Sequence, residues 1–96
     1  MTSFRPTEIQ QLAMQAKLNL ALGARVYDAV FLGFEVLEIV DSELRGWARS
    51  EYCAATIDIH FSAEVARIAQ GVLKQRMKRT SFLMRGLKHD TDEQPA

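Results

Sequence analysis

The sequence is poor in several residue types, and its shortage of cysteine excludes one class of protein. Its 96 residues include one cysteine, two prolines and one tryptophan. The single cysteine, Cys53, cannot form an intramolecular disulfide, which excludes a disulfide-stabilised scaffold and fits a reducing compartment. Because free cysteines are usually buried, we expect the Cys53 side chain to be a small core residue.

Long hydrophobic runs are also lacking. The longest apolar stretch is interrupted by charge well before the roughly 20 residues that a membrane span requires. Residues 1–10 contain no basic segment followed by an apolar one, so we expect no secretory signal and a cytoplasmic location. The hydrophobic fraction of 48% nevertheless excludes a disordered chain.

The chain has no excess of one charge, because 12 basic residues balance 12 acidic ones. The charges are unevenly placed, and residues 71–89 contain six basic side chains and no acidic one: Lys74, Arg76, Lys78, Arg79, Arg85 and Lys88. Such a block either contacts phosphate or forms the basic end of a helix. We favour the helix end, since basic residues in the last turn are an ordinary signal for the end of a helix.

Motifs for catalysis, cofactors and metals are absent from the sequence. It has no glycine-rich phosphate loop, no nucleophile elbow, no pair of cysteines and no closely spaced pair of histidines. Asp58 and His60 are two residues apart and point in different directions on a helix, while Glu35 and Glu38 share a face without a histidine beside them. The sequence therefore predicts a binding protein without cofactor or metal, rather than an enzyme.

The apolar spacing predicts an all-α fold. Thr7 and Gln10 have the spacing of a capping box, and apolar residues then recur at helical spacing: Ile9, Leu12, Ala13, Ala16, Leu20 and Ala24. We expect one long helix from Thr7, bent at most at Gly23 and ending at Arg45-Gly46.

A second long helix is expected from Glu51 to Arg79, with Ser50 as its cap. Residues 53–61 also alternate with period two, as in a strand, but the helical pattern extends further. The prediction is a long helical hairpin over residues 1–87, with a short helical turn near Gly86 and a disordered polar tail over residues 88–96.

Between Val26 and Val40 the predicted first helix has two apolar stripes instead of one. One stripe is Val26, Val30, Gly33, Leu37, Val40 and Leu44, and the other is Ala24, Tyr27, Phe31 and Phe34. A small chain has little left to cover a second face, so we predict a homodimer or a partner interface. The predicted interface residues are Tyr27, Val30, Phe31, Phe34 and Leu37, with Trp47 as an anchor. The alternative that these aromatics form an intrachain core stays open.

Two segments resemble one family. Residues 52–60, Tyr-Cys-Ala-Ala-Thr-Ile-Asp-Ile-His, followed by Ala63 and Val65, resemble the second long helix of TraM-type quorum-sensing anti-activators, and Pro6-Thr7-Glu8-Ile9 resembles the opening of their first helix. The resemblance implies an all-helical homodimer that binds a LuxR-type transcription factor and blocks its dimerisation or DNA binding. Tyr52 and His60 are the positions it adds to the candidate interface.

Two other functions stay open at this point. A small DNA-binding regulator would use the basic block between Lys74 and Lys88, and its affinity would fall steeply with salt. A secretion-type chaperone or other helical adaptor would share the predicted fold and dimer but hold a different client.

Overall fold

The computed structural model describes residues 3–84. Along the chain the elements are β1 (Ser3–Phe4), α1 (Glu8–Leu22), α2 (Ala24–Val26), the π-helical turn η1 (Tyr27–Phe31), β2 (Glu35–Val40), β3 (Glu43–Ala48), α3 (Glu51–Thr56), the π-helical turn η2 (Ile57–Phe61), α4 (Ser62–Leu73) and β4 (Arg79–Met84). The predicted helical turn near Gly86 and the polar tail over residues 88–96 lie outside the described residues.

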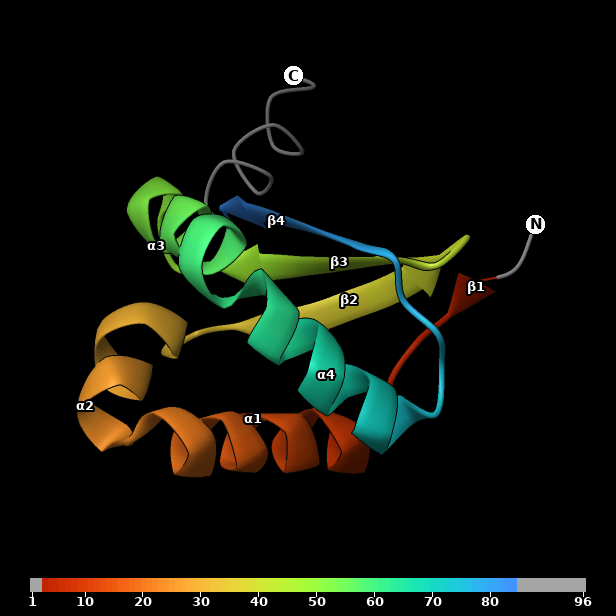
Figure 1. The fold of residues 1–96 in the computed structure, drawn as a ribbon, viewed down its shortest axis with the longest axis horizontal. Helices are drawn as coiled ribbons and strands as arrows, with labels where there is room; N and C mark the ends of the chain where they lie inside the picture. The colour runs from red at the N-terminus through yellow and green to blue at the C-terminus, as the bar shows by residue number, and fades with distance from the viewer. Residues whose placement is uncertain (1–2, 85–96) are drawn as a thin grey trace, which may run out of the picture.

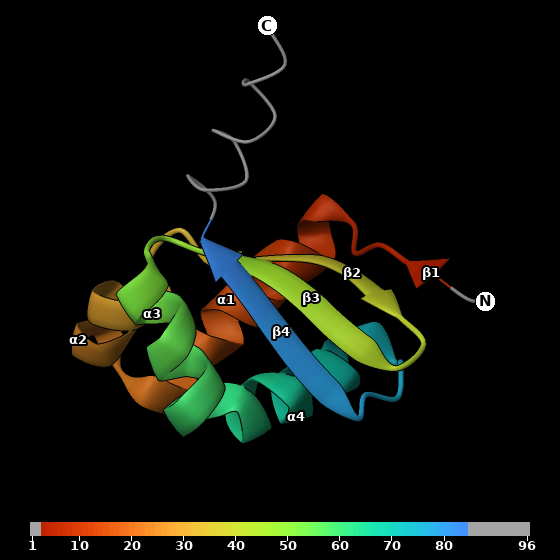
Figure 2. The same ribbon diagram turned by 90° about the horizontal axis from the view of Figure 1, so that it is seen from above.

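The fold is a mixed α/β arrangement, which corrects the predicted all-α hairpin. Four strands form one sheet in the order β1-β2-β3-β4. The first three pair antiparallel, whereas β3 and β4 pair parallel across the crossover that contains α3 and α4. Both α1 and α4 lie on the same face of this sheet (Figures 1 and 2).

The prediction of one long first helix is wrong, because α1 ends at Leu22 and helical structure stops at Phe31, well before Arg45-Gly46. Gly23 has a φ of +91°, a conformation that suits glycine and stops the helix rather than bending it. The segment predicted as the rest of that helix contains α2, η1 and the β2–β3 hairpin. Its turn is Asp41-Ser42, and both residues have positive φ, which suits a two-residue hairpin loop.

Gly46 does not end a helix but lies inside β3. A Cβ atom built there would come within 2.7 Å of the Glu35 carbonyl oxygen and 3.2 Å of the Phe82 ring. The absence of a side chain therefore lets β2, β3 and the Phe82 ring approach closely. Trp47, predicted in a connection, also belongs to β3.

The second predicted helix is correct in part. Ser50 caps α3 by accepting a hydrogen bond from the Cys53 N–H, and helical structure continues through η2 and α4. It ends at Leu73, not Arg79, because Lys74 adopts the left-handed conformation with a φ of +59°. The following residues form a connection and then β4.

The core lies between the sheet and the helices. Its largest fully buried side chains come from both the helical segments and the two central strands, and they include Phe31, Met14, Leu18, Leu44, Ile57 and Val36. Cys53 is also buried, as predicted, and its thiol donates a hydrogen bond to the Ala29 carbonyl oxygen across 3.6 Å. The chain itself therefore buries half of the residues that prompted the prediction of a second polypeptide, namely Tyr27, Val30, Phe31, Phe34 and Leu44.

Candidate protein-interaction surfaces

The structure does not bring the predicted interface residues together on one surface. Val30, Phe31 and Phe34 lie in the core, and Phe31 and Phe34 are 0% and 2% exposed. Tyr27 is buried as well, with its ring stacked on that of Phe31 at a centroid distance of 5.9 Å. These four side chains pack within the chain, which is the alternative that the sequence left open.

The other four predicted residues lie in two further places. Leu37 and Trp47 lie on the sheet face opposite the helices, where they line a hollow over β2, β3 and β4. Tyr52 on α3 is 75% exposed, and His60 on η2 is exposed too. Only Tyr52 and His60 thus combine full exposure with a place in the predicted interface.

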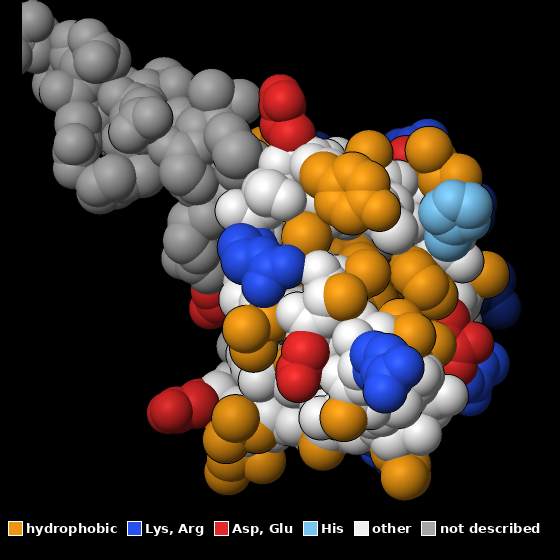
Figure 3. All heavy atoms as spheres, turned by 90° about the vertical axis from the view of Figure 1, so that its left-hand side faces the viewer, with side chains coloured by type: hydrophobic (Ala, Val, Ile, Leu, Met, Phe, Trp, Pro, Cys, Tyr) orange, Lys and Arg blue, Asp and Glu red, His pale blue; other side chains and the backbone are white. Residues whose placement is uncertain are grey.

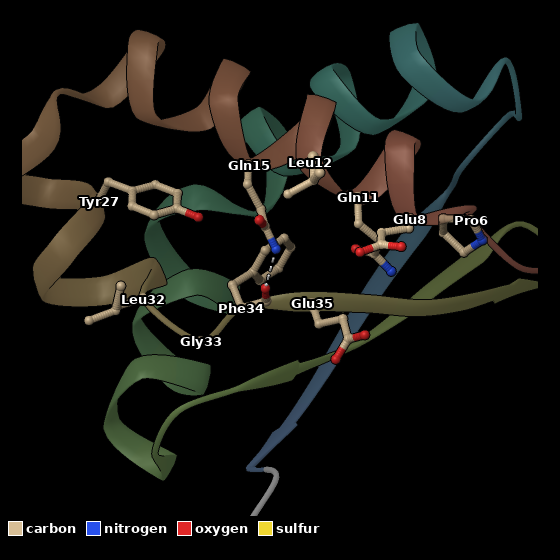
Figure 4. A pocket seen from close by; sticks show the side chains of 10 residues that line it. All are labelled: Pro6, Glu8, Gln11, Leu12, Gln15, Tyr27, Leu32, Gly33, Phe34 and Glu35. Atoms are coloured by element: carbon tan, nitrogen blue, oxygen red, sulfur yellow. Dashed lines mark hydrogen bonds between the residues drawn. The ribbon is translucent and has the colours of Figure 1, made fainter.

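A cleft of about 670 Å³ separates α1 from the beginning of β2 (Figure 4). Two glutamines of α1 bridge it. Gln11 accepts a hydrogen bond from the Val36 N–H and donates one to the Val36 carbonyl oxygen, and Gln15 donates to the Phe34 carbonyl oxygen. The Gln11 amide therefore pairs with both backbone groups of Val36, as the backbone of a neighbouring strand would.

The cleft also contains acidic and phenolic groups. Glu8 and Glu35 line it, and burial, together with the negative charge of Asp28, raises the pKa of the Tyr27 hydroxyl above its ordinary value. Tyr27 is therefore a neutral hydrogen-bond donor at physiological pH. Within residues 3–84 no three His, Cys, Asp or Glu side chains are placed to hold a metal ion together.

Replacing Gln11 with alanine is expected to lower the free energy of unfolding by about 1–3 kcal/mol, because the Val36 N–H and carbonyl groups lose their partners in a half-buried place. Urea denaturation of the variant and the parent measures the difference. Gln10→Ala is the poorer control, since Gln10 takes part in the capping box, so the exposed Lys17→Ala is preferred. Equal stability of Gln11→Ala and Lys17→Ala would contradict the bridging role.

The outward face of α1 carries an apolar stripe, which we call the α1 stripe. Its members recur at helical spacing and are Ile9, Leu12, Ala13, Ala16 and Leu20. Ile9 and Leu20 are 79% and 87% exposed, while Met14 and Leu18 on the opposite side of the helix are 1% exposed. Helix α1 is thus apolar on two faces. The helical spacing of these residues is visible in the sequence, but spacing alone does not say whether the face they form is buried or exposed.

A second exposed apolar surface lies on α3 and η2. Tyr52 and Ile59 are 75% and 72% exposed, and the exposed Ala55 lies between them. Figure 3, which views the α2 and α3 end of the molecule, shows hydrophobic side chains gathered among scattered charges. The sequence signal for this surface was the resemblance at residues 52–60, which singled out Tyr52.

The described part of the basic block follows a connection and a strand rather than one helix face. Lys74 caps α4, Arg76 and Lys78 lie in the connection, and Arg79 begins β4.

No helix among residues 3–84 is long and apolar enough to cross a membrane. Neither a protein-family model nor a curated protein matches this sequence.

Proposed function

We propose that this protein is a regulator that sequesters another protein. A helix of that partner docks on the α1 stripe. The observation that supports this most directly is the exposure of large aliphatic side chains along the outer face of α1. A helix of a globular domain ordinarily has one apolar face, directed at its own core. Here that need is met by Met14 and Leu18, so the stripe is available to a partner.

The geometry of the stripe suits a helical partner. Helix α1 has 15 residues and is therefore about 22 Å long. Ala13 and Ala16 lie in the middle and allow close approach, with Ile9 and Leu20 towards the two ends. Burying a leucine or isoleucine side chain contributes about 1.5–3 kcal/mol, so two such anchors supply much of a micromolar affinity.

The proposed client is a LuxR-type transcription factor, and the support for it is the sequence resemblance. Both resembling segments are helical in the structure: Glu8 and Ile9 open α1, and residues 52–60 lie in α3 and η2. The mixed α/β fold, however, differs from the helical hairpin that the resemblance implied. A partner that captures the free receptor shifts it away from its DNA-binding dimer. A cytoplasmic location and a homodimer belong to this proposal.

Leu20→Glu is expected to weaken receptor binding at least tenfold, because a carboxylate in the docked helix pair would be desolvated without a partner. The folded chain should keep its stability, since Leu20 is 87% exposed. The measurement is size-exclusion chromatography with light scattering, with and without ligand-bound LuxR-type receptors from the same source, followed by a gel shift of the receptor on its promoter. The same light scattering on the chain alone gives its oligomeric state.

Arg25→Glu is the matched control, because it also places a carboxylate at an exposed position, here in α2 and outside the stripe. Receptor binding that is the same in both variants and the parent would exclude the α1 stripe as the docking surface. A parent chain that ignores every receptor and itself retards promoter DNA, with affinity falling steeply as salt rises, would establish the DNA-binding alternative instead. Binding of neither would favour an adaptor with another client.

A further inference from the structure

The outer edge of β4 has no neighbouring strand in the described part of the chain. The sheet order ends at β4, and its pairing with β3 runs from Arg79 to Met84 without a register shift. A six-residue strand is about 20 Å long. Its outer side presents a row of backbone N–H and carbonyl groups that can pair with another extended chain.

The opposite edge of the sheet is protected by the chain itself. The short strand β1 pairs with Ile39 and Val40, and the Gln11 side chain satisfies both backbone groups of Val36. Proteins usually block sheet edges in such ways, because free edges attract other strands. The contrast between a blocked β2 edge and a long, regular β4 edge indicates that the β4 edge is kept accessible for use.

A groove runs beside the β4 edge, and its floor is helical. Figure 2 shows α3 extending past the edge of the sheet next to β4. A hollow of about 610 Å³ separates α3 from the second half of β4, and another of about 160 Å³ separates the start of α4 from the first half. The helical residues that line these hollows are mostly small, as Ala54, Ala55, Ala63 and Ala66 show. Small side chains leave room for those of an added strand.

The charges along this β4 groove have opposite signs at its two ends. Glu51 and Asp58 line the hollow beside the second half of β4, whereas Lys78 and Arg79 line the hollow at its start. All four side chains are exposed, and none forms an ion pair within residues 3–84. A ligand with the reverse polarity would pair with both ends.

We propose that the β4 groove binds an extended segment of a partner protein, which adds to the sheet as a fifth, antiparallel strand. In that direction the amino-terminal end of the segment lies beside Glu51 and Asp58, and its carboxyl-terminal end lies beside Lys78 and Arg79. The segment therefore has basic residues before, and acidic residues after, a core of β-branched or aromatic residues. Alternate side chains of that core point into the hollows, and the backbone pairs with β4.

A second copy of the chain fits this edge less well than a single strand. Two copies joined edge to edge through antiparallel β4 strands would place both helical layers on the same face. Neighbouring strands lie about 4.8 Å apart, whereas packed helices need about 8–10 Å between their axes. Because α3 already extends past the β4 edge, the α3 helices of the two copies would compete for the same space.

The test uses the full chain and a displayed library of nine-residue peptides. Each peptide has two lysines, then five positions randomised among Val, Ile, Thr, Ser and Phe, then two glutamates. A second library differs only in ending with two lysines. We expect the first library to yield binders enriched at least tenfold over the second. Backbone amides of β4 should become protected from hydrogen exchange when a selected peptide, made synthetically, is bound.

Variants then locate the peptide. Ala55→Arg fills the floor of the groove and should weaken binding of the selected peptide at least tenfold, while Ala21→Arg on the exposed side of α1 should leave it unchanged. The double variant Lys78→Glu with Arg79→Glu should weaken binding about fivefold or more. It should regain affinity for the same peptide remade with two terminal lysines, and Arg25→Glu serves as the charge control.

Several results would overturn the proposal. Two of them are equal enrichment of the two libraries and full peptide binding by Ala55→Arg. The third is a parent dimer that Ala55→Arg converts to monomers, because that result would assign the edge to a second copy of the chain. The inference does not rest on the proposed sequestering function, because it concerns another surface. Leu20→Glu should bind the selected peptide normally, so failure of one proposal is distinguishable from failure of the other.

Discussion

Replacing Phe31 with alanine is expected to lower the free energy of unfolding by about 3–5 kcal/mol, which is comparable with the whole stability of a small domain. The Phe31 side chain is 0% exposed and lies at the centre of an aromatic cluster. Its ring centroid is 5.3 Å from that of Phe34 and 5.6 Å from that of Phe61, both edge-to-face, and it stacks on Tyr27. Alanine would leave a cavity among these rings as well as losing the buried area.

Urea denaturation followed by circular dichroism measures this effect. If Phe31→Ala does not fold, Phe31→Leu keeps most of the volume and should cost about 1.5 kcal/mol or less. The control is Leu32→Ala at the neighbouring residue, whose side chain is 51% exposed, and it should change stability by less than about 1 kcal/mol. A Phe31→Ala chain as stable as Leu32→Ala would mean that Phe31 is not in the core.

Gly46→Ala is expected to destabilise the fold by about 1–3 kcal/mol, although alanine normally suits a strand better than glycine does. The added Cβ would meet the Glu35 carbonyl oxygen at 2.7 Å, closer than such atoms approach in proteins. Because that oxygen belongs to the backbone of the paired strand, relief requires β2 and β3 to move apart. Differential scanning calorimetry should show a lower Tm.

Gly71→Ala provides the matched control for this change. Gly71 lies in α4, and a Cβ built there has no heavy atom within 4 Å. Alanine should therefore stabilise the helix by about 0.5–1 kcal/mol and raise the Tm. The same substitution is thus predicted to have opposite signs at two glycines, and a rise in Tm at both would show that β2 and β3 can separate freely at Gly46.

The parts of the fold that the sequence revealed are governed by local chemistry. The Thr7 and Gln10 side chains form the predicted capping box, and Ser50 caps the next helix as expected. These signals depend on a few neighbouring residues whose hydrogen bonds close within one turn. Helical periodicity was also a correct guide from Glu51 as far as Leu73.

The hairpin was missed because a β-bulge changes the spacing of its apolar residues. The register of β2 against β3 shifts between Val36 and Glu38, so the buried residues Val36 and Ile39 are three apart instead of two or four. Three is a helical spacing. The turn that joins the strands, Asp41-Ser42, contains neither the glycine nor the asparagine that marks most two-residue hairpin loops.

The candidate surfaces could be predicted only in part, because exposure depends on the tertiary fold. Periodicity placed Ile9 and Leu20 on an apolar face of a helix, but the same pattern fits a face in the core or one in solvent. Phe31 and Phe34 were predicted as interface residues because large aromatic side chains are typical of interfaces. In the structure both side chains are buried in the core. The β4 groove needed a strand that the sequence did not indicate.

The parallel pairing of β3 with β4 has a consequence for the order of folding. Glu43 pairs with Arg79, and the whole of α3, η2 and α4 lies between them in the chain. Closing such a long loop costs entropy before any contact between the two strands can repay it, whereas the β2–β3 hairpin closes across two residues. Strand β4 is therefore expected to join the sheet after the rate-limiting step, so that substitutions within it speed unfolding and leave the folding rate nearly unchanged.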